Sequence, residues 1–354
     1  MKQRRGLKAL LCVLAAVVLI VGGYVAYVFI DYHRLPDNLP LEVQGGEAAP
    51  LAVDADLTLM TYNIGFGAYE PDYGFFMDGG TQSWAWSEDR LRTNLGNIAG
   101  FLAEQDPDFL FLQEVDENST RTYHVDERAY MTGALPDHAW VYAQNWDSPF
   151  LFYPFTQPHG KSRTGILTFS RYGIAEALRR SLPVETSVMK IVDLDRCYSV
   201  SRVPVENGRE LVLFNAHLSA YTSDGAVTAR QMRMLLAEMA EEYEKGNYVI
   251  GGGDFNRDLL GDSSKVFGIS GSDYNWAQPI DLSAFKGLPL TLAAGSNAPT
   301  CRMTDGPLTP DTYVLTVDGF VCSDNVQLVA EESVDTGYAW SAHNPARLTF
   351  RLRP

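Results

Sequence analysis

Residues 245–258 read KGNYVIGGGDFNRD, an apolar run at Tyr248 to Ile250 that leads through three glycines to Asp254 and Asn256. The run predicts a buried strand with two polar side chains at its end. Because glycine lacks a Cβ, the glycines predict a place where the sheet opens into a crevice. At alternate positions, Asp254 and Asn256 are expected to face the same side of an extended segment. A glycine turn capped by the Asp side chain explains the same letters, and this stretch alone favours that interpretation.

The same pattern, in which an apolar run is joined to a polar side chain, recurs along the chain. It places Asn63 after the run at 57–62, Glu114 after 109–113, His217 after 211–215, Asp318 within 313–322, and His343 shortly before 348–352. The runs are typical of strands, and two amphipathic segments at 87–105 and 232–243 are typical of helices. This alternation predicts a layered α/β domain with two packed sheets.

The first 56 residues differ from the rest. Residues 1–8 are basic, and as a helix the uncharged apolar run at 9–30 would span roughly 33 Å, enough for the hydrocarbon core of a bilayer. We predict a single-pass signal anchor in the cell membrane; a cleaved signal peptide is the alternative, although no clean small-residue cleavage site follows. The basic flank predicts that the remainder lies on the extracytoplasmic side. Residues 31–56 are interpreted as a linker, followed by one domain at 57–354.

Composition limits the classes of function. The chain has 354 residues, and a hydrophobic fraction of 46% is ample for a globular core. The first 34 residues hold five of the 28 basic and one of the 44 acidic residues, so the remainder carries a formal charge of −20. That charge disfavours long nucleic acid as a partner, although a local basic patch could override it. Lys161 and Arg163 are candidates for a phosphate-facing patch, and a solvated loop explains them about as well.

The cysteines leave two alternatives open. Cys12 lies in the apolar run, so Cys197, Cys301 and Cys322 remain for the domain. A disulfide between Cys301 and Cys322 would suit an extracytoplasmic compartment, and buried free thiols fit the sequence at least as well.

Six motifs, taken in order, resemble the endonuclease/exonuclease/phosphatase superfamily, which includes deoxyribonuclease I, inositol polyphosphate 5-phosphatases and neutral sphingomyelinases. They are Thr-Tyr-Asn-Ile at 61–64, Leu-Gln-Glu-Val at 112–115, Asn-Ala-His-Leu at 215–218, Gly-Asp-Phe-Asn at 253–256, Val-Asp-Gly-Phe at 317–320 and Ser-Ala-His-Asn-Pro at 341–345. Each motif alone is weak, but together they cover about residues 57–354. The resemblance implies a four-layer α/β sandwich, in which two mixed sheets are flanked by helices, and cleavage of phosphoester bonds with Mg²⁺, or Mn²⁺ as a substitute.

The resemblance also implies roles for the residues at the metal and the attacking water. Glu114 would be the principal Mg²⁺ ligand, helped by Asn63, and Asp254 would orient or deprotonate the water. These roles fit the chemistry, because hydrolysis of a phosphoester requires charge neutralisation and an oriented water. A hard cation that retains several waters needs only one or two carboxylates from the protein.

Further roles concern the phosphate group. By the same resemblance, Asn256 and His217 would bind phosphate oxygens, and Asp318 would hold His343 in one tautomer. An aspartate beside a histidine raises the histidine pKa, which suits either a base or a charged phosphate clamp. The sequence leaves both roles open for His343.

One position departs from the family pattern. Relatives carry Ser-Asp-His where this chain has Ser341, Ala342 and His343. The missing carboxylate helps to bind the metal in relatives, directly or through water, so its loss predicts weaker Mg²⁺ binding. Activity is still expected, because the metal needs few protein ligands.

These observations predict a membrane-tethered, extracytoplasmic, metal-dependent phosphodiesterase or phosphatase. The tether, the acidic charge and the aromatic-rich stretches at 66–86 and 140–155 favour a phospholipid or another small phosphoester near a bilayer. An extracytoplasmic nuclease is the second hypothesis. The third hypothesis is a non-catalytic binding module that has lost activity, for which Ala342 would be the first sign. No protein partner is inferred.

Overall fold

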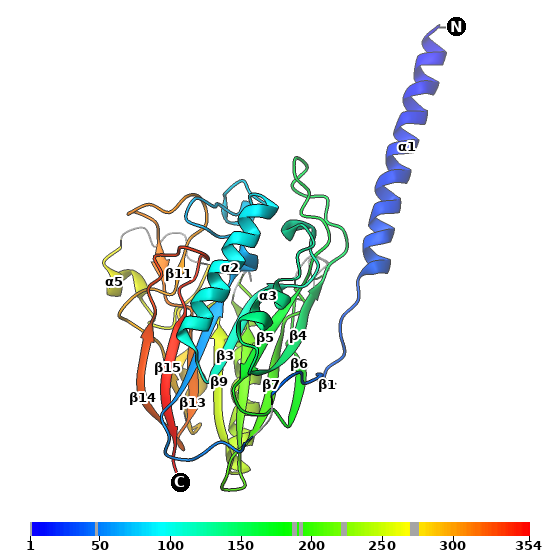
Figure 1. The fold of residues 1–354 in the computed structure, drawn as a ribbon. Helices are drawn as coiled ribbons and strands as arrows, with labels where there is room; N and C mark the ends of the chain where they lie inside the picture. The colour runs from blue at the N-terminus through cyan, green and yellow to red at the C-terminus, as the bar shows by residue number, and fades with distance from the viewer. Residues whose placement is uncertain (1, 47–48, 186–189, 191–193, 221–224, 270–275) are drawn as a thin grey trace.

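Two β-sheets lie face to face, with helices on their outer faces and a long N-terminal helix that projects from one end (Figure 1). The structure is a computed structural model that describes residues 2–46, 49–185, 190, 194–220, 225–269 and 276–354. The predicted four-layer α/β sandwich is therefore confirmed.

The strands form two mixed sheets. The first has the order β1 (Leu39–Pro40), β6 (Glu176–Ser181), β7 (Cys197–Pro204), β8 (Glu210–His217), β9 (Tyr248–Asp254), β13 (Asp318–Ser323) and β10 (Leu290–Ala293). The second has the order β14 (Val326–Ser333), β15 (Ala346–Leu352), β2 (Leu57–Asn63), β3 (Phe109–Asp116), β5 (Arg163–Ser170) and β4 (Ala139–Asp147). A separate short pair is formed by β11 (Cys301–Arg302) and β12 (Val314–Leu315).

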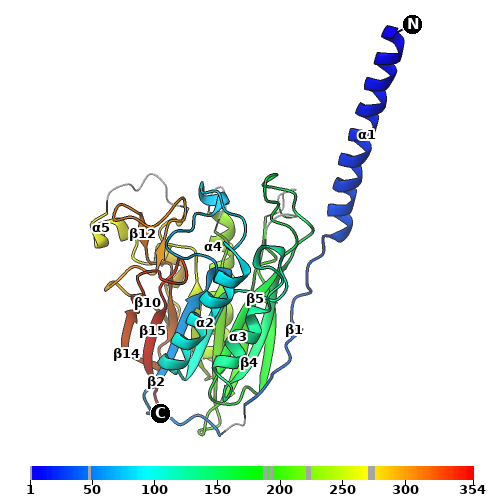
Figure 2. The same ribbon diagram turned by 45° about the horizontal axis from the view of Figure 1, so that its top comes forward.

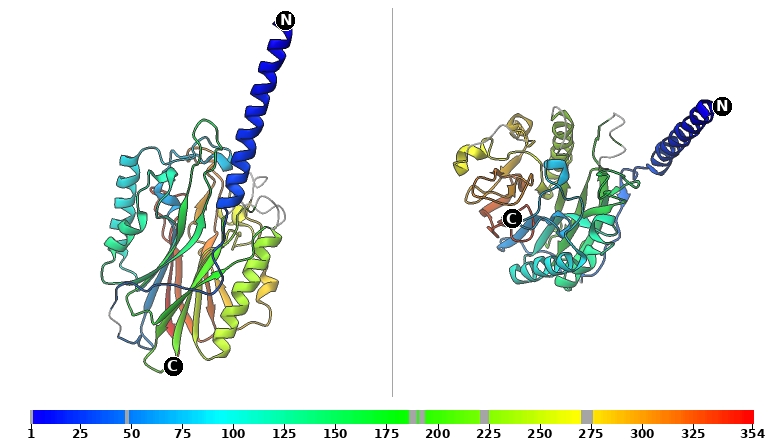
Figure 3. Two further views of the ribbon diagram at one scale, coloured as in Figure 1. Left: turned by 90° about the vertical axis from the view of Figure 1, so that its right-hand side faces the viewer. Right: turned by 90° about the horizontal axis from the view of Figure 1, so that it is seen from above.

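Helices cover both outer faces of the sandwich. The α-helices are α1 (Lys2–Asp31), α2 (Glu88–Gln105), α3 (Glu127–Ala134), α4 (Ala226–Glu244) and α5 (Ser263–Phe267). Short 3₁₀ turns lie at η1 (Gly65–Gly67), η2 (Phe76–Asp78), η3 (Thr120–Thr122) and η5 (Leu282–Phe285). Figure 3 shows α2 and α3, in cyan, and α4, in yellow-green, on opposite sides of the strands.

Alternation along the strands divides the core into layers. Leu57 and Leu59 pack between the two sheets, whereas Met60 and Tyr62 pack under α2. Successive side chains of a strand point to opposite faces, so each central strand serves two layers at once. This is why the central strands read as continuous apolar runs in the sequence.

Strand register brings the polar ends of several strands together. The parallel pair β2 and β3 aligns Asn63 with Gln113, and the parallel pair β8 and β9 aligns His217 with Asp254. The antiparallel strand β13 begins with Asp318 directly opposite Asp254. The functional side chains therefore gather at one end of the sandwich.

Local signals in the sequence were most informative for the helices. The Ser87 side chain accepts a hydrogen bond from the Arg90 amide and caps α2, and Asp106, in the left-handed conformation at φ 43°, ends it. The span 117–160 showed no clear period, yet it contains α3 and β4. In β4, half-buried Trp140 and Tyr142 alternate with buried alanine and valine, so apolar side chains on both faces hide the period of two.

The N-terminal segment combines a projecting helix with an ordered connection. By length and composition alone α1 could cross a membrane, although a signal sequence would pass the same test. The segment interpreted as a linker runs along the domain, because β1 pairs with β6 and Leu51 is buried beside Val205. Figure 2 shows α1 beyond the edge of the sandwich at which β1 lies. All four cysteines are free thiols, so no disulfide joins Cys301 and Cys322.

Candidate active site

The end of β9 confirms the role expected of its glycines. Gly253 has φ 135°, and a Cβ at this position would lie 1.9 Å from the Ala216 carbonyl oxygen of the neighbouring strand. Only glycine fits this backbone conformation and this close approach. Asp254 follows at once, fully buried, and borders a cleft of about 150 Å³.

The expectation that Asp254 and Asn256 alternate along an extended segment is wrong. Asn256 has φ 49°, so the chain leaves the strand before it. The Asn256 amide donates a hydrogen bond to Asp254 Oδ1 (2.9 Å), and its side-chain Nδ2 donates to the Leu218 carbonyl (2.8 Å). The segment is thus an Asx-type turn at the mouth of the sheet, and both residues border the cleft.

A bulge in β3 positions Glu114. Register between β3 and β5 shifts between Leu112 and Val115, and Glu114 has φ 55°. A bulge re-aims a side chain that regular pleating would direct elsewhere. Here it directs Glu114 to the cleft, where its carboxylate stays partly exposed.

Asn63 joins the two central carboxylates. Its Nδ2 donates to Glu114 Oε1 (3.1 Å) and to Asp254 Oδ2 (3.0 Å), and its Oδ1 accepts from the Gly65 amide (3.0 Å). In this orientation the amide nitrogen, rather than the oxygen, faces the carboxylates. Asn63 therefore holds Glu114 and Asp254 at a fixed spacing.

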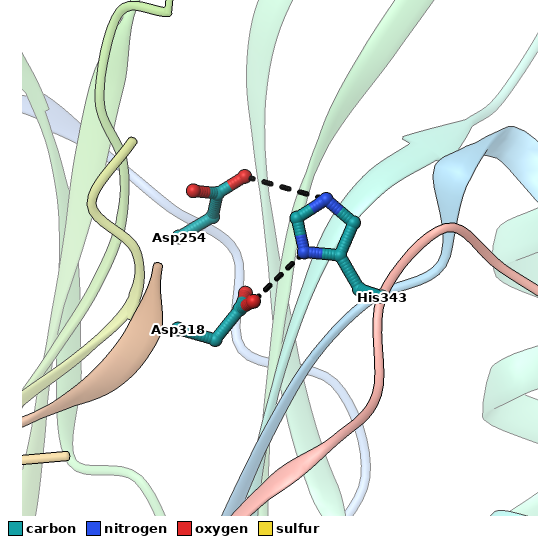
Figure 4. A group of neighbouring side chains, drawn as sticks. All are labelled: Asp254, Asp318 and His343. Carbon is teal, nitrogen blue, oxygen red and sulfur yellow. Dashed lines mark hydrogen bonds and ion pairs between the residues drawn. The ribbon is translucent and has the colours of Figure 1, made fainter. Parts of the chain in front are cut away.

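His343 lies between two carboxylates (Figure 4). Its Nδ1 is 2.8 Å from Asp318 Oδ2, and its Nε2 is 3.9 Å from Asp254 Oδ2 and 3.5 Å from Cys301 Sγ. Burial alone would lower the pKa of His343, but the Asp318 carboxylate and the Cys301 side chain together outweigh burial, and the net result is a pKa well above the usual value. The His343 ring is therefore held as an imidazolium at neutral pH.

His217 approaches the same carboxylate from the neighbouring strand. Its Nε2 is 3.6 Å from Asp254 Oδ2 and 4.0 Å from Glu114 Oε1. Burial, helped by the positive charges of Arg196 and His343, lowers the pKa of His217 well below its usual value. Burial, followed by repulsion from Asp318, raises the pKa of Asp254.

The cleft also contains three arginines that sequence reasoning missed: Arg121, Arg196 and Arg302. Arg121 forms an ion pair with Asp116 at 2.8 Å, and Arg302 donates to the Glu70 carbonyl. Arg196 is 4% exposed, and its Nε and Nη1 have no hydrogen-bond partner among the described residues. No motif marked these arginines, because they lie in segments without strand periodicity or directly before a strand.

The predicted basic patch lies elsewhere. Lys161 and Arg163 are not among the residues that line the cleft. Lys161 pairs with Asp31 and Asp147, and Arg163 pairs with Asp147 and Glu117. The structure therefore brings Asn63, Glu114, His217, Asp254, Asn256, Asp318 and His343 together, but not these two side chains.

Ala342 stands beside the imidazole in the wall of the cleft. It is 5% exposed, and its carbonyl accepts a hydrogen bond from the Arg302 amide (2.9 Å). The Ser341 hydroxyl donates to the Asn63 carbonyl (2.7 Å) and fixes the loop on the end of β2. The position of the absent family carboxylate is thus inside the site.

A family model for the endonuclease/exonuclease/phosphatase family matches residues 60–337. The chain belongs to this family. Members of the family are metal-dependent phosphoester hydrolases, so the protein is an enzyme of this class. No curated protein matches the chain.

Solved structures of the family share the fold. One is an endonuclease/exonuclease/phosphatase from Beutenbergia cavernae, with 17% identity, a TM-score of 0.60 and coverage of 84% of this chain and 72% of that one. ANGEL2, a 2',3'-cyclic phosphatase solved with adenosine-2',3'-vanadate, has 16% identity, a TM-score of 0.56 and coverage of 89% and 99%. TDP2 from D. rerio, solved with a single-strand DNA product, has 15% identity, a TM-score of 0.53 and coverage of 84% and 100%.

The donor set fits the divalent cation on which this family depends. Carboxylate oxygens of Asp254 and Asp318 lie within 4.8 Å of each other, and Glu114 shares the Asn63 amide with Asp254. Asp318 Oδ1 is buried and has no hydrogen-bond partner in the part of the chain that the structure describes. Carboxylate oxygens crowded in a buried site repel one another, and a hard divalent cation relieves this repulsion.

Proposed function

We propose that the protein is a membrane-anchored, extracytoplasmic, Mg²⁺-dependent phosphoester hydrolase that acts on a phospholipid or another small phosphoester. The observation that supports it is the convergence on Asp254 Oδ2 of Asn63 at 3.0 Å, His217 at 3.6 Å and His343 at 3.9 Å. Groups from segments far apart in the sequence thus gather around the carboxylate that would activate the attacking water.

Metal binding falls to the carboxylates at the mouth of the sheet. Glu114 would be the principal ligand, and Asn63 would offer its oxygen only after its amide turns by half a rotation. A Mg²⁺ ion held there would neutralise phosphate charge and polarise the P–O bond. Water can complete its coordination, which explains how the site works with few protein ligands.

The attacking water belongs beside Asp254. Burial and Asp318 raise the pKa of this carboxylate, so it is a better proton acceptor than an ordinary aspartate. As the water oxygen bonds to phosphorus, its proton passes to Asp254. The Asn256 amide donates to the other Asp254 oxygen at 2.9 Å and keeps the carboxylate oriented.

Charged and neutral donors divide the phosphate oxygens between them. His343, held as an imidazolium by Asp318, would bind a phosphoryl oxygen and hydrogen-bond the leaving oxygen as the P–O bond breaks. Neutral His217 and buried Arg196 would bind the remaining oxygens. Donors preorganised around developing charge are usually a large part of catalysis.

The test of hydrolysis uses the full-length protein in detergent with Mg²⁺. Bis-p-nitrophenyl phosphate and p-nitrophenyl phosphate separate diester from monoester hydrolysis. We expect turnover that EDTA abolishes and that Glu114→Ala reduces by about 10²-fold or more, the usual scale for loss of a group that stabilises the transition state. Glu117→Ala is the matched control, since Glu117 pairs on the surface with Arg128 and Arg163. A folded wild type without turnover on either ester would support the binding module instead.

Membrane topology is a separate test. The basic flank at Lys2, Arg4, Arg5 and Lys8 favours a cytoplasmic N-terminus, and α1 provides the span. In cells whose outer face is exposed to a protease, the domain should be degraded while an N-terminal tag is protected. Protection of the domain would contradict the extracytoplasmic assignment.

Nuclease activity is the remaining alternative for the enzyme. The charge of −20 opposes long DNA, and the three cleft arginines are buried rather than arranged as a surface track. Binding of single-stranded and double-stranded DNA should therefore be weak, with a flat plot of log K against log salt. A steep negative slope would favour the nuclease.

A further inference from the structure

Residues 148–160, the aromatic loop, connect β4 and β5 at the same end of the sandwich as the active site. The loop reads SPFLFYPFTQPHG and has no Asp, Glu, Lys or Arg. Register fixes its location, because Asp147 pairs with Arg163 and Thr164 pairs with Asp116 at the site end of β3. Burial lowers the pKa of His159 to about 3, so its ring is uncharged as well.

Three aromatic side chains of this loop face outward. Phe152 is 52% exposed, Tyr153 63% and Phe155 84%. An exposed apolar patch of this kind is unusual on a soluble domain and marks a surface that another apolar phase covers. In Figure 1 the loop is the green segment that rises beside the lower end of α1.

The two ends of the loop meet the polar base of α1. Lys161 Nζ is 3.4 Å from Asp31 Oδ2, and His33 Nε2 is 3.8 Å from Asp147 Oδ2. These polar groups mark the level at which the apolar run of α1 ends. The loop begins and ends at this level.

The middle of the loop climbs along α1. The Phe150 amide donates to the Tyr27 hydroxyl (3.0 Å), and the Tyr24 hydroxyl donates to the Phe150 carbonyl (2.9 Å). The Tyr24 and Phe152 rings pack edge to face with centroids 5.2 Å apart. At about 1.5 Å per residue, Tyr24 lies roughly 10 Å along the helix from Asp31, inside the apolar run. If α1 spans a bilayer, the loop must therefore reach the interfacial layer.

The opposite side of the loop forms a wall of the active site. His159 lines the cleft, and the Trp84 Nε1 donates to the Pro158 carbonyl (2.8 Å). Tyr153 packs against Phe76 with ring centroids 5.8 Å apart, and neighbouring Met77, more than half exposed, also lines the cleft. One loop thus connects the apolar helix to the mouth of the cleft.

We propose that the aromatic loop docks on the outer leaflet beside α1 and holds the mouth of the cleft against the bilayer, where it takes the phosphodiester headgroup of a phospholipid. This rests on the proposed function, because it requires α1 to span the membrane and the site to cleave phosphoesters. Tyrosine and phenylalanine at this depth suit the interface, where rings contact both apolar chains and polar headgroups.

Docking is tested by a probe on the loop of the full-length protein in phosphatidylcholine vesicles. In a Cys12→Ser background the remaining thiols are buried, so a fluorophore can be attached at Phe155→Cys. Val329→Cys is the matched control, because Val329 is 45% exposed on the edge strand β14. Its neighbour Leu328 pairs with Phe350, and Phe350 pairs with Leu57 at the start of β2, the end opposite the site. A nitroxide carried by the lipid headgroup should quench the probe at 155 by several-fold and leave the probe at 329 unchanged. Equal quenching at both positions, or none at 155, would overturn the docking.

Its consequence for substrate is tested by replacing the three exposed rings with Phe152→Ser, Tyr153→Ser and Phe155→Ser in one variant. None of the three lines the cleft, so turnover of bis-p-nitrophenyl phosphate should stay within twofold of wild type. Release of headgroup phosphate from the vesicles should fall about tenfold or more. Equal loss on both substrates, or no loss on the vesicles, would overturn the proposal. If wild type cleaves neither substrate, the proposed function fails, while the quenching result still decides the docking.

Discussion

Two histidines on opposite walls of the cleft face the same carboxylate oxygen, but one ring is charged and the other is neutral. His343, from the loop before β15, and His217, from the end of β8, lie 3.9 Å and 3.6 Å from Asp254 Oδ2. Both rings are buried. Burial by itself disfavours the charged form of each, so another contact must separate them.

The two histidines differ in the contact that their second ring nitrogen, Nδ1, makes. His343 Nδ1 lies 2.8 Å from Asp318 Oδ2, whereas His217 Nδ1 has no hydrogen-bond partner among the described residues and has Arg196 nearby. The pKa of His343 is raised and that of His217 is lowered. One wall therefore supplies a charged donor and the other a neutral one. The predictions that follow test this difference, starting with the largest effect.

Removal of the charged imidazole of His343 should lower the rate of hydrolysis more than any other change. His343→Ala removes a charged donor in the cleft, and we expect kcat on a phosphoester to fall by about 10²-fold or more, within the range for a positioned acid, base or oxyanion donor. His124→Ala is the control, because His124 is exposed and outside the cleft. A rate near that of wild type in His343→Ala would mean that the site has been misplaced.

The aspartate behind His343 should control the pH profile. The proposed mechanism needs Asp254 as a carboxylate and His343 as an imidazolium, so the wild-type rate should rise as pH rises through the raised pKa of Asp254 and fall as pH rises through the raised pKa of His343. In Asp318→Asn, the largest contribution that opposes burial is lost, so the His343 pKa should fall and the basic limb should move to lower pH. Each unit of displacement corresponds to a tenfold change in the protonated fraction at high pH.

The pKa itself can be measured by NMR of the His343 ring in metal-free protein, in wild type and in Asp318→Asn. An unchanged pKa of His343 in the variant would show that Asp318 does not set the charge of this ring. Asp318 would then not explain the difference in charge between His343 and His217.

The sequence predicted some features of the cleft and not others. The order of motifs gave the family and the fold, and the strand ends gave most of the polar side chains in the cleft. The bulge at Glu114 and the turn at Asn256 carried no local signal, because a positive φ at these residues is imposed by neighbouring strands. Arg196 was missed for a similar reason, since its position depends on the fold rather than on a pattern.

Aromatic-rich stretches show the same limit. The stretches at 66–86 and 140–155 have similar composition, yet Phe66 and Tyr73 are buried in the core under α2, whereas Phe155 is largely exposed. Composition alone could not distinguish a packed loop from an exposed one. That distinction required the contacts of the aromatic loop with α1.

Removal of the neutral imidazole of His217 should lower the rate less than removal of the charged imidazole of His343. A neutral hydrogen bond is worth about 0.5–1.5 kcal/mol, so His217→Ala should lower kcat/KM by roughly 3- to 10-fold. The rate of this variant should keep the wild-type pH profile, because the titrating ring is on the other wall. A loss as large as that of His343→Ala would show that His217 also acts as a charged group.

Restoring the family carboxylate beside His343 should have the smallest effect and should act on the metal. Ala342 borders the cleft, so Ala342→Asp adds a carboxylate to a donor set that already holds three, and we expect Mg²⁺ to bind a few-fold more tightly by calorimetry. Ala342→Asn, of equal size and without charge, is the control. If Asp and Asn variants bind Mg²⁺ equally, the added charge does not reach the metal, and the existing carboxylates already meet its needs. Tighter binding in Ala342→Asp alone would place the metal beside residue 342. The added carboxylate would also raise the pKa of His343, so the fall of the rate at high pH should move to higher pH.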